Sequence, residues 1–186
     1  FGPRSEEVGV TLHNLASVHY FRDDLETAAR LYRRSADIEL ARRGRDSHGY
    51  ATSLHTLSMV RQEQGRYAEA LELQTEALAI RERVMGPDHH HTALSLCTMG
   101  ALRRQLGEPE AGIAPGRRAL AICAARHGPA HPETGWARDE LAATLVAAGR
   151  RPEAAALYAD AAAALLRAGL EAEARVARAR ADSLGR

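Results

Sequence analysis

The chain has 186 residues, of which 45% are hydrophobic and 26% are charged. Its 25 basic and 24 acidic residues leave a net charge of +1, so it lacks the basic excess that gives a protein affinity for nucleic acid. No apolar run approaches the roughly 20 residues that a membrane-spanning helix needs. We therefore expect neither a nucleic-acid partner nor insertion into a membrane.

The two cysteines give no sign of a disulfide framework or a zinc ribbon. Cys97 and Cys123 are far apart in the sequence, and no CxxC motif is present. This usage fits a protein of the reducing cytoplasm. We therefore expect a cytoplasmic location.

A repeat of 42 residues organises the chain. The segment TLHNLASV at 11–18 returns as SLHTLSMV at 53–60, as SLCTMGAL at 95–102, and in a weaker form as RDELAATL at 138–145. Self-similarity at such a period is typical of solenoids built from stacked units. One strict register relates all four segments and places these residues at one position: Leu15, Leu57, Met99 and Leu141.

Each unit has the pattern of a helical hairpin. In the second unit, Leu54, Leu57 and Val60 are spaced for one helix, 70–78 contains the apolar positions of another, and Gly65 lies in the turn between them. A single hairpin cannot bury its apolar face, whereas stacked hairpins can. We expect the first helices to point these side chains into the core: Leu12, Leu15, Leu54, Leu57, Leu96, Met99 and Leu141.

Small residues recur at two positions in every unit, one in each helix of the hairpin. Nothing larger than a methyl or hydroxymethyl group then separates the two backbones, so the helices can approach closely. These positions hold Ala16, Ser58, Gly100 and Ala142 in the first helices and Ala28, Ala70, Gly112 and Ala154 in the second helices.

In chain order we expect hairpins at about 5–46, 47–88, 89–130 and 131–169, then a helix at about 170–184, all in one domain of residues 1–186. In the third hairpin, Gly112, Pro115 and Gly116 weaken the second helix, so a kink or local looseness is expected there. The last segment keeps one apolar face under an arginine-rich outer face, which suits a capping helix. That face comprises Leu170, Ala174, Ala177, Ala181 and Leu184.

The start of the chain also follows the register. The chain opens at Phe1 without a methionine, and Gly2 stands 42 residues before Gly44, so the segment up to Arg4 aligns with a linker between repeats. We expect the chain to be part of a longer array.

The segments GRYAEALELQTEALAIRERVMGPDHHHTA at 65–93 and HGPAHPETG at 127–135 resemble the tetratricopeptide repeat. The resemblance is to the 42-residue variety of kinesin light chains and of many bacterial signalling proteins, and it covers about residues 5–170. It implies an all-α fold, a right-handed α-solenoid of helix-turn-helix repeats. It also implies a surface that binds a peptide or partner protein in a concave groove lined by the first helices.

Three adjacent histidines at 89–91 raise the question of a metal site. In the repeat register, His89 and His131 share a position with Ser5 and Ser47, just before a first helix. A serine hydroxyl or a neutral imidazole there can accept a hydrogen bond from a free backbone N–H of the helix. We favour this capping role over metal binding, because the residue four places beyond His91 is not a metal ligand.

Two residues follow each of these capping positions at the start of the helix. After His131 come Pro132 and Glu133, which suit the first turn, whereas His90 and His91 replace them in the third repeat. A positive charge is unfavourable at a helix start, so we expect the third repeat to loosen as the pH falls.

A second metal candidate is the stripe of equivalent positions His13, His55, Cys97 and Asp139. Neighbouring helices lie about 8 to 10 Å apart, so at most two members of the stripe could share one ion. We favour polar residues facing a groove, and expect no metal and no cofactor.

The motifs GxSxG, GxGxxG and HExxH and the P-loop are absent, and Cys123 lies in an apolar run, as a small core residue would. We therefore expect the protein to have no enzymatic activity. The alternative from this other functional class is a metal-dependent or thiol-dependent enzyme.

The groove is expected to be lined by first-helix residues that lie beside the core positions. The family's paired asparagines are represented only by Asn14, and Arg104 is the only cation among these positions, so a neutral, partly apolar ligand segment is favoured. Trp136 serves either as an aromatic anchor or as packing between repeats. The expected groove residues are His13, Asn14, Ser17, Tyr20, Phe21, His55, Thr56, Met59, Gln62, Glu63, Cys97, Thr98, Arg104, Gln105, Trp136, Asp139 and Glu140.

These observations give one leading hypothesis for function. We expect a noncatalytic module that binds a peptide or partner protein, as the scaffold or sensor part of a larger bacterial signalling or regulatory protein. The alternative within the same class is self-association into a homo-oligomer through an exposed terminal repeat.

Overall fold

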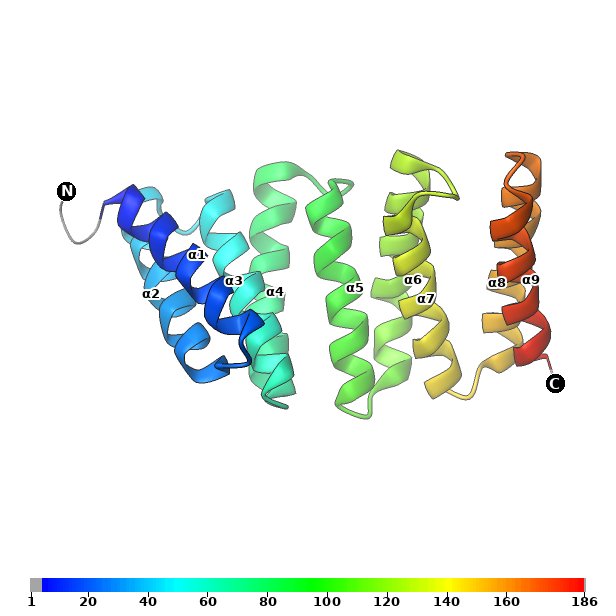
Figure 1. Cartoon of the computed structure of the whole chain (residues 1–186), viewed down its shortest axis with the longest axis horizontal. Coiled ribbons are helices and arrows are strands. Elements are labelled where there is room, and N and C mark those ends of the chain that lie inside the picture. The colour runs from blue at the N-terminus through cyan, green and yellow to red at the C-terminus, as the bar shows by residue number, and fades with distance from the viewer. Residues whose placement is uncertain (1–4, 186) are drawn as a thin grey trace. The chain divides into compact units, whose positions relative to one another are not determined.

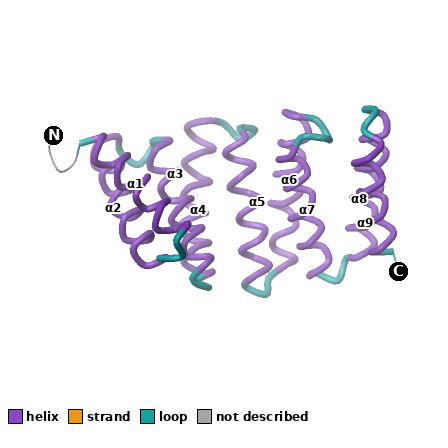
Figure 2. Tube along the Cα trace, viewed as in Figure 1, coloured by secondary structure: helices purple, strands orange, loops and turns teal. Residues whose placement is uncertain are grey.

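The computed structural model describes residues 5–185, and the expected linker at Phe1 to Arg4 lies outside the described residues. Within them all regular structure is helical (Figures 1 and 2). The first helices of the repeats begin 42 residues apart, as the register predicts. The helices are α1 (Glu6–Phe21), α2 (Leu25–Arg43), α3 (His48–Glu63), α4 (Tyr67–Met85), α5 (His90–Gln105), α6 (Pro109–His127), α7 (Pro132–Ala147), α8 (Arg151–Arg167) and α9 (Glu171–Leu184).

The chain divides into two compact units, Phe1–Ser95 and Leu96–Arg186. The first unit holds the hairpins α1/α2 and α3/α4 together with the start of α5, and the second holds the rest of α5 and the helices α6 to α9. Within each unit, successive helices run antiparallel and pack side by side (Figure 1). None of the described helices has the length and apolar character needed to cross a bilayer.

The turn inside each hairpin requires a left-handed backbone conformation. Gly65, Gly107 and Gly149 supply it, with φ between 71° and 78°. In the first hairpin the same place is held by Asp23, at φ 62°, and no other non-glycine residue in the described range has a positive φ. Asp tolerates this region better than most residues because its short polar side chain bonds locally, so the first hairpin closes without a glycine.

The first helices are capped as the repeat register predicts. The Ser5 hydroxyl accepts from the N–H of Val8, and the Ser47 hydroxyl from the N–H of Tyr50. The Nδ1 atom of His131 accepts from the N–H of Glu133 at 3.2 Å, and Nδ1 of His89 accepts from the N–H of His91 at 3.3 Å. A neutral imidazole thus imitates the serine hydroxyl at the same position.

Helices α5 and α6 approach closely because both crossing positions are glycine. A Cβ atom at Gly112 would lie 2.8 Å from the carbonyl oxygen of Gly100, and one at Gly100 would lie 3.2 Å from the carbonyl oxygen of Gly112. The α6 helix runs from Pro109 through Pro115 to His127 without interruption. Its residues Gly112, Gly116 and Ile113 are buried, and this packing stabilises a helix whose composition alone favours it poorly.

The core follows the predicted stripe in most places. In the first unit, Leu57 and Val60 of α3 pack against Ala28, Ala29 and Tyr32 of α2. In the second unit one cluster joins α6, α7, α8 and α9, and another holds α8 and α9 together. The capping-helix face is buried at Ala174, Ala177 and Ala181.

One core prediction is wrong and another is only partly met. Leu15 is 44% exposed, although its equivalent Leu57 is fully buried. The face of α3 that carries Leu57 packs on α2, whereas no described helix precedes α1 to cover the matching face. Met99 is half-buried, while the other predicted core leucines are buried.

Candidate functional site

The stripe of first-helix positions 13, 55, 97 and 139 faces a matching stripe on the second helices. In the first repeat, the His13 ring meets the Tyr32 ring edge-on at 5.0 Å, and the Tyr32 hydroxyl lies 2.8 Å from the Ser17 hydroxyl. In the second repeat, Nδ1 of His55 lies 3.0 Å from Oε1 of Gln74. These side chains contact one another across the first two hairpins, so they form a polar layer inside each of these hairpins.

The third and fourth repeats change the chemistry of this layer. In the third, the positions equivalent to His55 and Gln74 are Cys97 and Gly116, and Leu141 lies 3.1 Å from where a Gly116 side chain would begin. In the fourth, the Tyr158 hydroxyl donates to Oδ1 of Asp139 at 2.8 Å. The layer therefore becomes apolar in one repeat and charged in the next.

The predicted groove residues differ widely in their exposure. Asn14, Phe21, Met59, Glu63, Gln105 and Trp136 are exposed. The half-buried residues are His13, Ser17, Tyr20, Thr56, Gln62, Arg104, Asp139 and Glu140. The remaining three, His55, Cys97 and Thr98, are buried, so a partner cannot reach their side chains at the surface of this structure.

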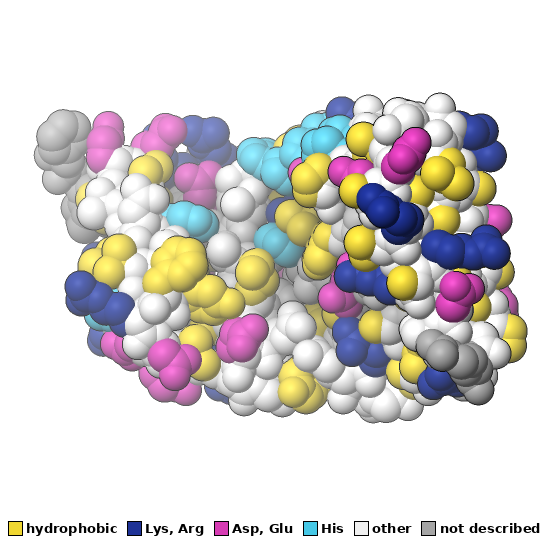
Figure 3. All heavy atoms as spheres, turned by 45° about the vertical axis from the view of Figure 1, so that its right-hand side comes forward, with side chains coloured by type: hydrophobic (Ala, Val, Ile, Leu, Met, Phe, Trp, Pro, Cys, Tyr) yellow, Lys and Arg dark blue, Asp and Glu magenta, His cyan; other side chains and the backbone are white. Residues whose placement is uncertain are grey.

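The exposed apolar side chains of the first unit concentrate on its first helices. Phe21 is 85% exposed and meets the Tyr20 ring edge-on at 5.8 Å. Met59 on α3 is exposed as well. Burial is the larger cause that raises the pKa of Tyr20, and the nearby Glu63 carboxylate raises it further. We call these four residues the aromatic patch. Figure 3 shows hydrophobic side chains gathered on the visible face of the molecule.

The only cation among the predicted groove positions is already paired. Arg104 on α5 donates to the Glu140 carboxylate on α7 at 3.0 Å, and both side chains are about 30% exposed. This ion pair links the first helices of two successive repeats, so Arg104 is less available to an anionic partner than its sequence position indicates.

Histidine side chains form a group at the starts of α3 and α5 (Figure 3). The rings of His48 and His91 lie 4.9 Å apart, and those of His90 and His91 lie 3.9 Å apart. Burial, His90 and Arg81, in decreasing order, lower the pKa of His91 to about 4. Neutral rings can stack in this way, whereas protonated rings would repel one another.

A buried arginine that the sequence analysis did not single out lies beneath these rings. Arg81 of α4 is 1% exposed and donates to the His91 carbonyl at 3.0 Å and to the Ser95 hydroxyl at 2.8 Å. Burial lowers its pKa to about 10. Arg81 thus fastens α4 to the start of α5. The equivalent residue of the first repeat is Glu39, which lies against Gly49 of α3.

The arrangement of metal-ligating side chains and the state of the two cysteines bear on the metal and thiol alternatives. They contain no group of three or more His, Cys, Asp or Glu side chains placed to hold a metal ion. Both cysteines are free and buried, and burial raises the pKa of each thiol. A thiol that remains protonated at neutral pH is a poor nucleophile.

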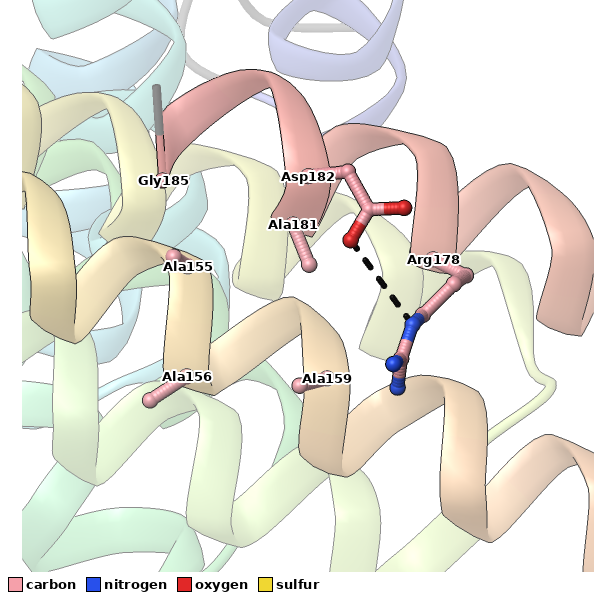
Figure 4. Close-up of a pocket in the computed structure, with 7 residues that line it drawn as sticks. All are labelled: Ala155, Ala156, Ala159, Arg178, Ala181, Asp182 and Gly185. Atoms are coloured by element: carbon pink, nitrogen blue, oxygen red, sulfur yellow. Dashed lines mark ion pairs between the residues drawn. The ribbon is translucent and has the colours of Figure 1, made fainter.

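A hollow of about 630 Å³ opens between α8 and α9 (Figure 4). Ala155, Ala156 and Ala159 of α8 face Ala181 of α9, and an ion pair of 3.7 Å between Arg178 and Asp182 lies at its edge. The residues of α8 that line the hollow are all alanine, so no large side chain from this helix fills the space.

A smaller cavity of about 240 Å³ combines charged and apolar walls. It lies among the linker before α7 and the helices α7, α8 and α9, and Arg138, Asp139, Tyr158 and Arg180 all line it. Arg138 was not among the predicted site residues. The signal that could have found it is the register, since 138 is a leucine position in the first three repeats.

Comparisons with known proteins agree with this architecture. The family described as tetratricopeptide repeat matches residues 7–83 and 49–125, which together span more than half of the chain. The chain therefore belongs to the tetratricopeptide repeat family. Repeats of this family are typically noncatalytic and bind peptides or proteins. No curated protein sequence matches the chain.

Solved structures show the same fold. The kinesin-light-chain TPR-like repeats of Podosopora anserina, described as nearly identical to one another, share 20% identity with a TM-score of 0.83, over 94% of this chain and 85% of theirs. A single-residue variant of the same repeats shares 19% identity with a TM-score of 0.85, over 100% and 89%. BtubC (BKLC) from P. vanneervenii shares 20% identity with a TM-score of 0.72, and the match covers 95% of this chain and 62% of BtubC. The predicted all-α, kinesin-light-chain-like solenoid class is confirmed.

Proposed function

We propose that this protein is a noncatalytic interaction module that binds a peptide segment of a partner protein at the aromatic patch of the first unit. The observation that carries the proposal is Phe21, which is 85% exposed beside Tyr20 and is held on a well-formed helix. Large aromatic side chains dominate the binding energy of many interfaces. The patch has a single charge, that of Glu63, so it favours an apolar segment flanked by a basic residue.

The wider setting belongs to the same proposal. We infer that the chain works in the cytoplasm as the scaffold or sensor part of a larger bacterial signalling protein, with both units acting as one tetratricopeptide domain. The two cysteines, free and buried, support a reducing compartment.

A peptide library displayed on phage tests the binding proposal. We expect peptides with an apolar residue near a basic one to be enriched, and Phe21→Ala combined with Met59→Ala to weaken their binding about tenfold or more by fluorescence anisotropy. Val84→Ala is the matched control, because Val84 is also an exposed apolar residue but lies on a second helix. Enriched peptides that bind the double variant as tightly as they bind wild type would contradict the proposed surface.

A second candidate function is self-association through α1. Leu15 and Val18 are 44% and 45% exposed, whereas their equivalents Leu57 and Val60 are fully buried against the preceding hairpin. A second copy of the chain could cover this face. We expect sedimentation equilibrium to show a concentration-dependent dimer, and we expect Leu15→Glu combined with Val18→Glu to abolish it. Even a weak interface has an affinity in the micromolar range. A wild-type chain that stays monomeric at about 100 μM would therefore reject this candidate.

A further inference from the structure

Two arginines replace the buried leucine of the repeat at the C-terminal end of the array. Leu12, Leu54 and Leu96 hold one register position in the first three repeats, and each is at most 9% exposed. The next two positions in register are Arg138 and Arg180. A guanidinium at a core leucine position is costly unless something compensates its charge. Arg180 is exposed and pairs with Asp139, so the substitution that requires an explanation is the one at 138.

Arg138 is buried without a carboxylate of its own. The residue is only 9% exposed, and one guanidinium nitrogen donates to the carbonyl oxygen of Pro129 at 3.0 Å. No carboxylate in the described part of the chain forms a hydrogen bond with it. Burial lowers the pKa of Arg138, and nearby Asp139 opposes that effect only as a smaller cause.

Arg138 lines the cavity of about 240 Å³. Pockets that hold drug-sized ligands span about 300 to 1,000 Å³, so this one suits a molecule of amino-acid size. One wall is aliphatic and consists of Leu165, Val176 and Ala177.

Two carboxylates with free acceptor capacity line the same cavity. The Tyr158 hydroxyl and the Arg180 guanidinium both donate to Oδ1 of Asp139, which leaves Oδ2 without a hydrogen bond in the described residues. Glu173 of α9 is exposed and has no ion pair within the described range. The cavity therefore offers two guanidinium groups, of which Arg180 is already paired with Asp139 and Arg138 has no carboxylate partner among the described residues, together with two anionic acceptors and an apolar wall.

We propose that this cavity binds a free α-amino acid with a small aliphatic side chain. The ligand carboxylate lies on Arg138, its ammonium group lies between Asp139 and Glu173, and its side chain packs on the aliphatic wall. Arg recognises a carboxylate through its fork of N–H donors, and a cation and an anion in one small cavity select a zwitterion over either single charge. This ligand site is separate from the aromatic patch, so the two proposals can fail independently.

Isothermal titration calorimetry with L-leucine tests the site on the chain as it exists. We expect saturable binding of L-leucine, and binding weaker by about tenfold or more for L-leucinamide, which lacks the carboxylate, and for 4-methylpentanoate, which lacks the ammonium group. Glycine, L-alanine and L-valine measure the contribution of the aliphatic wall. Absence of saturable heat with all four amino acids at millimolar concentration overturns the proposal.

The variant Arg138→Leu provides the sharpest control. It restores the leucine found at positions 12, 54 and 96, so the protein should fold and its melting temperature should stay the same or rise. We expect this variant to lose leucine binding, while Arg167→Leu, an exposed site on α8 outside the cavity, retains it. Equal binding by wild type and Arg138→Leu would show that Arg138 does not hold the ligand, which also overturns the assignment.

Discussion

Gly112→Ala is expected to lower the free energy of unfolding of the second unit by about 2 kcal/mol. A Cβ atom at this position would lie 2.8 Å from the Gly100 carbonyl oxygen and 3.1 Å from the Thr144 methyl group. The first contact is with backbone, which cannot rotate away, so α5 and α6 must separate. The cost of this separation outweighs the helix propensity that alanine gains over glycine, about 1 kcal/mol.

Gly135→Ala is the matched control for this prediction. Gly135 lies in α7 of the same unit, and a Cβ atom there would meet nothing within 4 Å. Only the propensity term remains, so we expect this variant to be more stable by about 0.5 to 1 kcal/mol. Urea unfolding followed by the fluorescence of Trp136, the single tryptophan, reports on this unit. Changes in the free energy of unfolding that are equal and of the same sign in both variants would contradict the idea that α5 and α6 leave no room for a Cβ at 112.

The second large effect is a loss of stability of the first unit in mild acid. Burial, with a smaller contribution from the Arg81 charge, lowers the pKa of His55 from 6.5 to about 4, although its hydrogen bond with Gln74 opposes the shift. The unfolded chain therefore binds a proton more readily than the folded one. Stability is complete above about pH 6.5 and falls as the pH drops toward 4, by on the order of 3 kcal/mol.

Urea titrations of wild type and His55→Gln between pH 7.5 and 4 measure this effect. Glutamine can still form a hydrogen bond with Gln74 but does not titrate, so its profile should be flatter. His131→Gln is the control, because His131 lies in the second unit and caps α7. Identical profiles for wild type and His55→Gln would show that another group causes the loss.

Amide hydrogen exchange distinguishes the effect of protonating His55 from the effect of protonating the histidine group at the start of α5. The pKa of His91 is also lowered to about 4, so its protonation, and the loosening of α5 expected from the sequence, belong near that pH. His90, Arg81 and His48 add to the effect of burial on this pKa, and each lies close to the His91 ring or backbone. The His55→Gln variant lacks the His55 imidazole. If amides of α5 in this variant are less protected at about pH 4 than at neutral pH, the loosening belongs to the histidine group.

The repeat register accounted for most of the fold. Helices begin at the predicted spacing, the caps at Ser5, Ser47 and His131 form the predicted bonds, and the small residues at 100 and 112 lie where two backbones meet. These features are local or repeat in every unit, so a period and a turn signal suffice to predict them.

The exposure and pairing of the predicted groove residues did not follow from the register, because equivalent positions do not have equivalent neighbours. His13 is half-exposed while His55, at the same position, is buried against Gln74. Arg104 was predicted as the only cation of the groove, and it pairs with Glu140, which is distant in the sequence. Charge pairing and exposure depend on which side chain the adjacent repeat presents, and that differs from repeat to repeat.

Periodicity and bonds between near neighbours are enough to specify that this chain consists of helical hairpins, where each helix starts, and which residue caps it. The exposure of Leu15, the burial of Arg81 under the histidines 89–91, and the position of Arg138 beside a cavity became evident only from the packed helices. Burial and electrostatics depend on contacts between repeats, and a register that makes positions equivalent does not specify what covers each of them.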